Sequence, residues 1–179
     1  MHTVDRQREQ LKLAGLENVP GTDLSWAKAD ISKFDLKSPY AVLLPGGAPH
    51  RPAKRWPVDQ FSDLARHLSE KGITPVVLGV ASEKNLAQAT LFGISNGLDL
   101  TGQTDLVEIA TLAGNAVLVI GNDTGPMHVA ASAGCPGVVL FSDASDPKLC
   151  APRSEKIKII ERKSLEGLSV EEVLDAASI

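Results

Sequence analysis

"AVLVIGNDTGPMHVAASAGCP" spans residues 116–136 and joins an apolar run, a polar turn and a stretch of small residues. The run Ala116–Ile120 is rich in β-branched and apolar side chains, which is typical of a buried strand. Pro126 suits the first turn of a helix because an amide hydrogen has no partner there. The alanine-rich stretch His128–Ala133 predicts a helix that packs closely on a sheet. A strand that passes through a short turn into a helix is half of a βαβ unit.

The same alternation of strands and helices extends outward over most of the chain. Strands are predicted where short apolar runs end near glycine or proline, and helices where apolar residues recur at helical spacing. The predicted strands are Tyr40–Leu44, Thr74–Leu78, Leu98–Leu100, Ala116–Ile120, Gly137–Phe141 and Lys156–Ile160. The predicted helices are Thr3–Ala14, Val58–Glu70, one after the N-cap residue Ser82, one from Thr104 or Asp105 through Leu112, His128–Ala133, and one opened by the capping box Ser169-x-x-Glu172.

This alternation predicts an α/β fold: a doubly wound, mainly parallel, Rossmann-like sheet of about six strands with helices on both faces. In the strand order 3-2-1-4-5-6, a binding crevice opens where the loops after the first and fourth strands diverge. Those loops are Pro45–Pro57 and Gly121–Met127, which carry most of the functional side chains. The sequence therefore predicts a ligand site between them. Residues 1–38 are expected to form an interdomain helix and linker, and residues 39–179 the Rossmann-like domain.

The composition excludes several classes of protein. With 179 residues, of which 43% are hydrophobic and 22% charged, the chain has the size and balance of one globular domain. A net charge of −4 argues against a general nucleic-acid binder. We expect neither a membrane-spanning helix nor a secretory signal, because the long apolar runs of both are missing. Cys135 and Cys150 are expected to be free thiols of a cytoplasmic protein.

The turn that opens the helix after the fourth strand has two interpretations. In the functional one, backbone amides point out of a helix N-terminus that attracts anions, namely those of Thr124, Gly125 and Met127. In the structural one, Asp123 only caps the helix and His128 is an ordinary packed or solvated residue. The position of the turn at the predicted crevice favours the anion site.

The loop "PGGAPHRPAKRWP" at residues 45–57 gathers four basic or potentially basic residues: His50, Arg51, Lys54 and Arg55. Clustered cations that face a helix N-terminus are suited to hold phosphates. The alternative is a solvated run of charges that Trp56 anchors to the core. The spacings GxxxxGK[ST] and GxGxxG are both absent, so the loop is neither a Walker A loop nor a dinucleotide-binding fingerprint.

Two further positions are candidates for nucleotide contacts. Glu83 follows the second strand, where a carboxylate often binds ribose hydroxyls, although the first turn of a helix also favours an acidic residue. The stretch Thr101–Thr104 follows the third strand and is placed to face a base. Asp143 and Asp146 are interpreted as turn-forming residues, and no metal site is predicted.

At this point the motifs resemble those of a known family. "GNDTGPMHVAASAGCPGVVLFS" at 121–142 is similar to the D-[ST]-G-x-x-H signature of glycosyltransferase family nine, the bacterial heptosyltransferases of lipopolysaccharide core synthesis. "LLPGGAPHRPAKRWPVDQFSDLARHLSEKG" at 43–72 resembles the P-G-[AS]…K-x-W-P-x-x-x-[FW] segment of the same family. The stretches 76–87 and 100–125 follow its spacing, so the resemblance covers about Ala41–Phe141. "FSDASDP" at 141–147 stands where the family commonly has F-G-x-[ST]-x-P.

The resemblance implies a GT-B fold of two facing Rossmann-like domains, of which this chain looks like the C-terminal, donor-binding one. It implies a nucleotide-sugar donor, ADP-heptose, and a lipopolysaccharide core acceptor at the membrane surface, without a cofactor or metal. The implied catalytic residues are Lys54, Asp123 and His128. The implied donor contacts are Lys54 to the diphosphate, Glu83 to ribose, Thr104 in the adenine pocket, and Asp123, Thr124, Gly125, Met127 and His128 around the helix N-terminus.

In this family the general base that activates the acceptor lies in the N-terminal, acceptor-binding domain, which these residues lack; the enzyme is therefore expected to be a longer chain of which these residues are a part. We therefore expect this chain to bind nucleotide weakly and to be inactive in transfer by itself. The resemblance also implies a cytoplasmic enzyme, peripheral at the inner face of the inner membrane. Two alternatives stay open: a non-catalytic module that binds a nucleotide or phosphosugar, and half of a sugar-nucleotide epimerase.

Overall fold

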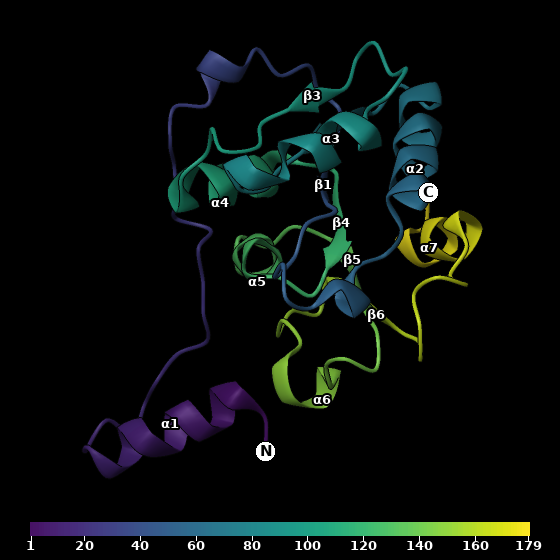
Figure 1. The fold of residues 1–179 in the computed structure, drawn as a ribbon. Coiled ribbons are helices and arrows are strands. Elements are labelled where there is room, and N and C mark those ends of the chain that lie inside the picture. The colour runs from purple at the N-terminus through teal and green to yellow at the C-terminus, as the bar shows by residue number, and fades with distance from the viewer.

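In the computed structural model, which describes residues 1–179, six strands form one parallel sheet (Figure 1). The strands are β1 (Tyr40–Leu44), β2 (Thr74–Val77), β3 (Leu98–Asp99), β4 (Leu118–Asn122), β5 (Gly137–Phe141) and β6 (Ile157–Glu161). Their order in the sheet is β3-β2-β1-β4-β5-β6, and every neighbouring pair is parallel. The predicted doubly wound topology is therefore confirmed. Its switch point lies between β1 and β4, whose loops leave the same edge of the sheet.

Helices connect the strands and cover both faces of the sheet. The α-helices are α1 (Thr3–Leu13), α2 (Val58–Glu70), α3 (Lys84–Thr90), α4 (Leu106–Asn115), α5 (Gly125–Ser132), α6 (Pro147–Cys150) and α7 (Val170–Ala177). Three single 3₁₀ turns, η1 (Ser32–Phe34), η2 (Pro52–Lys54) and η3 (Ala81–Glu83), lie in the connections. The capping boxes Asp105–Glu108 and Ser169–Glu172 form both of their reciprocal hydrogen bonds at the starts of α4 and α7.

The central strands of the sheet contribute alternate side chains to two separate cores. In β1, Val42 and Leu44 face the core beneath α4 and α5, whereas Ala41 and Leu43 face the core beneath α2, α3 and α7. The segment before β1 closes the first core with Ala27 and the side chain of Phe34. Because both faces are covered, the strands are continuous apolar runs, as the sequence indicates.

Some element boundaries differ from the sequence predictions. Helix α4 continues to Asn115, whose side-chain amide donates to the Thr111 carbonyl, so β4 begins at Leu118 and not at Ala116. Helix α5 begins at Gly125, three residues before the predicted start. The prediction that Ser82 is an N-cap is wrong, because Ser82 lies inside η3.

Helix α1 stands apart from the rest of the chain in Figure 1 and has no buried residue. Polar contacts near its N-terminus join it to the segment at the end of α6. The His2 ring Nε2 lies 3.1 Å from the Ala151 carbonyl oxygen, and the Thr3 hydroxyl donates to the Leu149 carbonyl at 3.0 Å. The longest helix in the structure has 13 residues, and none combines the length and hydropathy that crossing a bilayer requires.

Both cysteines are free, as predicted. Cys135 is buried in the core beneath α4 and α5, and burial raises the pKa of its thiol to about 12. At neutral pH Cys135 is therefore a small apolar core residue that carries no charge.

Candidate functional site

A cavity of about 800 Å³ opens at the carboxyl end of the sheet, between the loops after β1, β2 and β4. The loop after β1 contributes Gly46–Pro49 and Arg55, and the turn after β4 contributes Asp123–Pro126. The connection after β2 contributes Val80 and the side chain of Glu83. The loops that the sequence predicts to face one another thus line one cavity, which has the volume of a typical small-molecule site.

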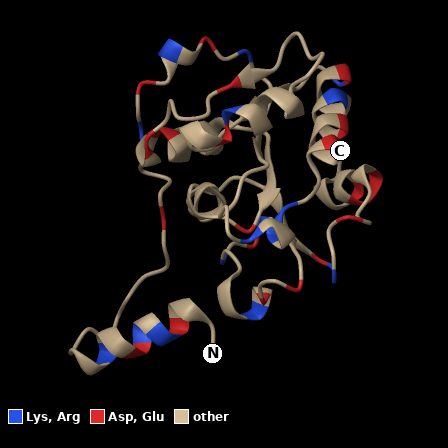
Figure 2. Ribbon diagram, viewed as in Figure 1, with Lys and Arg blue, Asp and Glu red and all other residues tan.

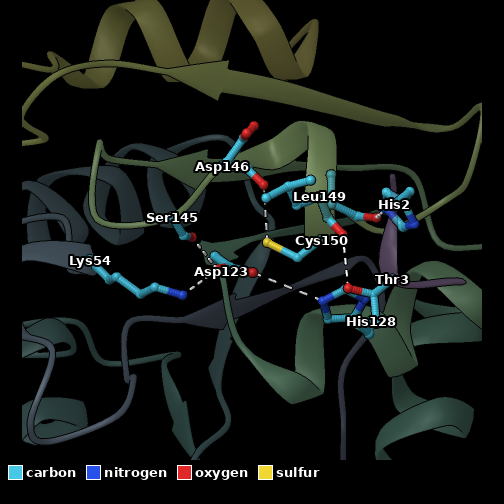
Figure 3. A network of polar contacts seen from close by, with 10 residues as sticks. His2, Thr3, Lys54, Asp123, His128, Ser145, Asp146, Leu149 and Cys150 are labelled. Atoms are coloured by element: carbon cyan, nitrogen blue, oxygen red, sulfur yellow. Dashed lines mark hydrogen bonds and ion pairs between the residues drawn. The ribbon is translucent and has the colours of Figure 1, made fainter. Parts of the chain in front are cut away.

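The centre of the polar network beside this cavity is the Asp123 carboxylate (Figure 3). Lys54 Nζ donates to Asp123 Oδ2 at 2.5 Å, and the Ser145 hydroxyl donates to the same oxygen at 2.6 Å. The side chains of Lys54 and Asp123 are only 14% and 8% exposed. A pair this strongly desolvated is held in one geometry, so the Lys54 ammonium is fixed beside Asp123, which lines the cavity, although Lys54 itself does not.

His128 lies on the other side of Asp123. Its Nε2 is 3.9 Å from Asp123 Oδ1, which is longer than a hydrogen bond, and its side chain is 44% exposed. Burial lowers the pKa of the imidazole, and the nearby Asp123 carboxylate only partly offsets this effect. His128 is therefore a mainly neutral ring at pH 7, next to the carboxylate that holds Lys54.

The N-terminus of α5 points at the cavity, but its cap differs from the structural interpretation of the sequence. The N-cap residue is Thr124, and Asp123 makes no capping hydrogen bond. The Thr124 hydroxyl is buried and has no hydrogen-bond partner. Gly125 leaves open space, since no atom lies within 4 Å of where a Cβ would be. This helix end therefore presents unsatisfied donors on the side that lines the cavity.

The backbone amide of Met127, which the sequence predicts to be free for an anion, already has a hydrogen-bond partner. The Met127 amide donates to the Thr124 carbonyl at 3.2 Å, and the Met127 side chain is fully buried in the core. The expectation that this amide points out freely is wrong, because the tight first turn of α5 uses it internally. Met127 positions the helix against the sheet and does not line the cavity.

Glu83 lies in the cavity wall with both carboxylate oxygens occupied by backbone amides. Oε1 accepts from the Gly47 amide at 2.9 Å, and Oε2 accepts from the Val80 amide at 3.0 Å. A Cβ atom added at Gly46 would lie 2.2 Å from Glu83 Oε1. Glu83 thus clamps the loops after β1 and β2 together, and glycine at position 46 is what permits its approach.

The basic residues of the loop at 45–57 are of two kinds, those exposed to solvent and those that contact the rest of the protein. His50 and Arg51 are exposed, whereas Arg55 donates through Nη2 to the Gly47 carbonyl and has a buried Nε without a partner. Thr104 is half-buried and does not line the cavity. Figure 2 shows basic residues on the η2 segment at the carboxyl end of the sheet, as the sequence indicates.

Sequence reasoning missed Asn122, the last residue of β4. Its fully buried side-chain amide donates to the carbonyls of Pro45 and Gly46 at 2.8 and 3.1 Å, and its Oδ1 accepts from the Trp56 amide at 2.9 Å. Asn122 therefore ties both ends of the Lys54 loop to β4. The signal that could have found it is an amide side chain at the end of an apolar strand, since such a group requires partners when it is buried.

The chemistry that this arrangement supports is the binding of an anion. Lys54, the start of α5 and the unpartnered Arg55 Nε and Thr124 hydroxyl offer positive charge and donors, while the two carboxylates are already engaged. No group of three or more His, Cys, Asp or Glu side chains is placed to hold a metal ion. A diphosphate matches such a set of donors.

Comparison with known proteins identifies the family. The model of glycosyltransferase family 9 (heptosyltransferase) matches residues 2–173. The chain is 33% identical over 119 residues to lipooligosaccharide heptosyltransferase 2 of Haemophilus influenzae, covering 64% of this chain and 34% of that protein. It is 32% identical over 136 residues to lipopolysaccharide heptosyltransferase 2 of Escherichia coli K12, covering 72% of this chain and 38% of that protein.

A solved structure of E. coli ADP-heptose lipopolysaccharide heptosyltransferase II superposes with a TM-score of 0.76 at 28% identity, over 90% of this chain and 51% of that one. The chain thus spans only 34% to 38% of the length of the curated relatives named above. A family model that matches nearly all of the chain, together with the shared fold, shows that this chain belongs to glycosyltransferase family 9.

Proposed function

We propose that this chain is the nucleotide-sugar-binding part of a heptosyltransferase that transfers heptose from ADP-heptose to a lipopolysaccharide core acceptor. The observation that carries the proposal is the Lys54 ammonium, fixed by Asp123 beside the N-terminus of α5. Family membership and relatives named as heptosyltransferases support the reaction, and the name of one relative supports ADP-heptose as donor.

In this proposal Lys54 binds the donor diphosphate and stabilises the negative charge that develops on the departing ADP. The Thr124 hydroxyl and the backbone at Gly125 bind the phosphates at the start of α5, and Asp123 and His128 position the phosphate and sugar. Glu83 contacts the ribose while it also clamps the loops. Thr104 lies outside the cavity lining, so an adenine contact from it requires the loop after β3 to move toward the base.

Transfer also requires a general base for the acceptor hydroxyl. Neither carboxylate of the cavity is free for this role, because Asp123 is paired with Lys54 and Ser145 and Glu83 accepts two amides. We therefore propose that the base comes from a second domain or chain, that residues 1–38 link to it, and that residues 39–179 bind the donor. In this proposal the acceptor is met at the cytoplasmic face of a membrane.

The occupied carboxylates also favour a second candidate, a module that binds a nucleotide or phosphosugar without catalysis. Both candidates bind ADP, and they differ in what happens to ADP-heptose when an acceptor-binding partner is present. Release of ADP from ADP-heptose in the presence of that partner and acceptor supports the transferase. Binding without any turnover supports the module.

Calorimetric titration of ADP and ADP-heptose into the wild-type chain, Lys54→Ala and Lys71→Ala tests the site. Lys71 is an exposed lysine at the end of α2 and makes no side-chain hydrogen bond or ion pair, so it controls for loss of charge. We expect Lys54→Ala to weaken ADP binding about tenfold or more, the usual effect of losing a hydrogen bond to a charged group. Absence of ADP binding, or equal binding by Lys54→Ala and the wild type, would falsify the proposal.

A further inference from the structure

A second cavity, of about 370 Å³, lies between α1, the linker that follows it, α5 and the segment after α6. Twelve residues line it, and none of them is an aspartate or a glutamate, although the chain carries a net charge of −4. Four lining residues are basic or potentially basic: His2, Arg8, His128 and Arg153. A volume of this size is that of a small-ligand site and exceeds the room that a few water molecules need.

Some of these groups are engaged in holding the cavity together. His2 Nδ1 accepts from the Val4 amide while Nε2 contacts the Ala151 carbonyl, so both ring nitrogens are occupied. Arg153 forms a two-pronged ion pair with Asp5, which offsets its charge. These contacts join α1 to the body of the chain and shape the walls of the cavity.

Other lining groups have no partner. The Arg8 guanidinium makes no hydrogen bond or ion pair and lies beside Gly21, where a Cβ would be 3.9 Å from Arg8 Nη2. The hydroxyls of Thr22 and Ser132 and the ring of His128 make no hydrogen bond either. Figure 2 shows that α1 carries both basic and acidic residues, and of these charged residues only Arg8 lines this cavity. Each of these unpartnered groups can donate a hydrogen bond to an anion, and the guanidinium of Arg8 also carries a positive charge.

This second cavity adjoins the first one across a single pair of side chains. Asp123 lines the first cavity, and His128, whose Nε2 is 3.9 Å from Asp123 Oδ1, lines the second. In Figure 3 the His128 ring lies between Asp123 and the start of α1, where His2 and Thr3 are seen. A ligand in the second cavity would thus lie on the far side of His128 from the donor.

We propose that the second cavity is a binding site for an oxyanion, a phosphate or carboxylate group, and that Arg8 is its principal ligand. A guanidinium that forms no hydrogen bond or ion pair, among hydroxyls that can donate, matches the planar or tetrahedral oxygens of such a group. This further assignment rests on the proposed function: the oxyanion is a group of the acceptor substrate, which meets the nucleotide-sugar donor across the side chain of His128. The site would then set which anionic acceptor is accepted and where it lies.

Nuclear magnetic resonance of the histidine rings tests the site, because the chain has four histidines of which His2 and His128 line the cavity. Inorganic phosphate and acetate are titrated separately into the ADP-saturated chain at constant ionic strength, so that the first cavity is occupied. We expect the His128 and His2 signals to shift in a saturable manner, while those of His50 and His67 stay still. The stronger of the two anions identifies phosphate or carboxylate as the natural group.

The matched variants are Arg8→Gln and Arg6→Gln, which remove the same charge from α1 inside and outside the cavity. Arg8→Gln is expected to weaken the anion affinity about tenfold, and Arg6→Gln to leave it within about twofold. Equal effects of the two variants, or no saturable shift at His128, overturn the site. If ADP fails to bind while the anion still shifts His128, the proposed donor function fails and the oxyanion site stands.

Discussion

Lys54 Nζ and Asp123 Oδ2 lie 2.5 Å apart, although 69 residues separate them in the chain. The loop after β1 and the turn after β4 lie together because β1 and β4 are neighbouring strands at the switch point of the sheet. Ser145, in the loop after β5, donates to the same carboxylate oxygen at 2.6 Å. Three loops thus converge on one carboxylate at the edge of the cavity.

Asp123→Asn is expected to lower the free energy of unfolding by roughly 1–2 kcal/mol, because a buried ammonium loses its charged partner. Urea unfolding measures this change. Asp143→Asn is the matched control, since Asp143 is exposed in the loop after β5 and makes no side-chain hydrogen bond. Equal stability of the two variants would show that the pair does not hold the loops in solution.

Gly46→Ala is expected to destabilise the fold by about 1–3 kcal/mol, the usual range for an atom forced into filled space. The added Cβ would lie 2.2 Å from Glu83 Oε1 and would break the clamp between the loops after β1 and β2. At the neighbouring Gly47 the nearest atom would be 3.5 Å away, an ordinary contact. Thermal unfolding should therefore show a larger loss of stability in Gly46→Ala than in Gly47→Ala. An equal loss in the two variants would contradict the role of Glu83 in holding the two loops together.

His128 is expected to make stability depend on pH. Burial holds the pKa of its ring below the ordinary value of 6.5, so the unfolded chain binds the proton more readily than the folded one. The contribution of His128 to stability is complete above pH 6.5 and is lost as pH falls below it, toward the pKa of the folded state. Urea unfolding between pH 5 and 8 should show a shallower slope in His128→Gln than in the wild type. A steeper or unchanged slope would mean that the ring is not buried as the structure has it.

The fold was predictable from the sequence because its signals are local. Apolar runs marked the strands, and the boxes Asp105–Glu108 and Ser169–Glu172 marked two helix starts, since each depends on residues three apart. The strand order followed from the alternation of strands and helices. Ser82 failed as an N-cap because the Glu83 carboxylate caps the Val80 amide instead.

The location of the site was predictable, but the roles of its residues depend on partners far apart in the chain. No local pattern shows that Asp123 pairs with Lys54 and does not cap α5, or that Glu83 accepts from an amide 36 residues away. The part of Asn122 in holding the Lys54 loop likewise appears only when β1 and β4 lie side by side. The second cavity depends on where α1 lies, which no pattern in the sequence fixes.

The proposed contact of Lys54 with the donor diphosphate can be isolated by comparing the binding of ADP with that of adenosine. Adenosine lacks the phosphates, so only ADP affinity should depend on the Lys54 ammonium. Calorimetry on the wild type, Lys54→Ala and the charge-preserving Lys54→Arg gives both affinities for each chain. We expect Lys54→Ala to lose about tenfold or more in ADP affinity, Lys54→Arg to lose less, and adenosine affinity to be the same in all three chains. Equal losses for ADP and adenosine, or none for ADP, would contradict the proposed contact.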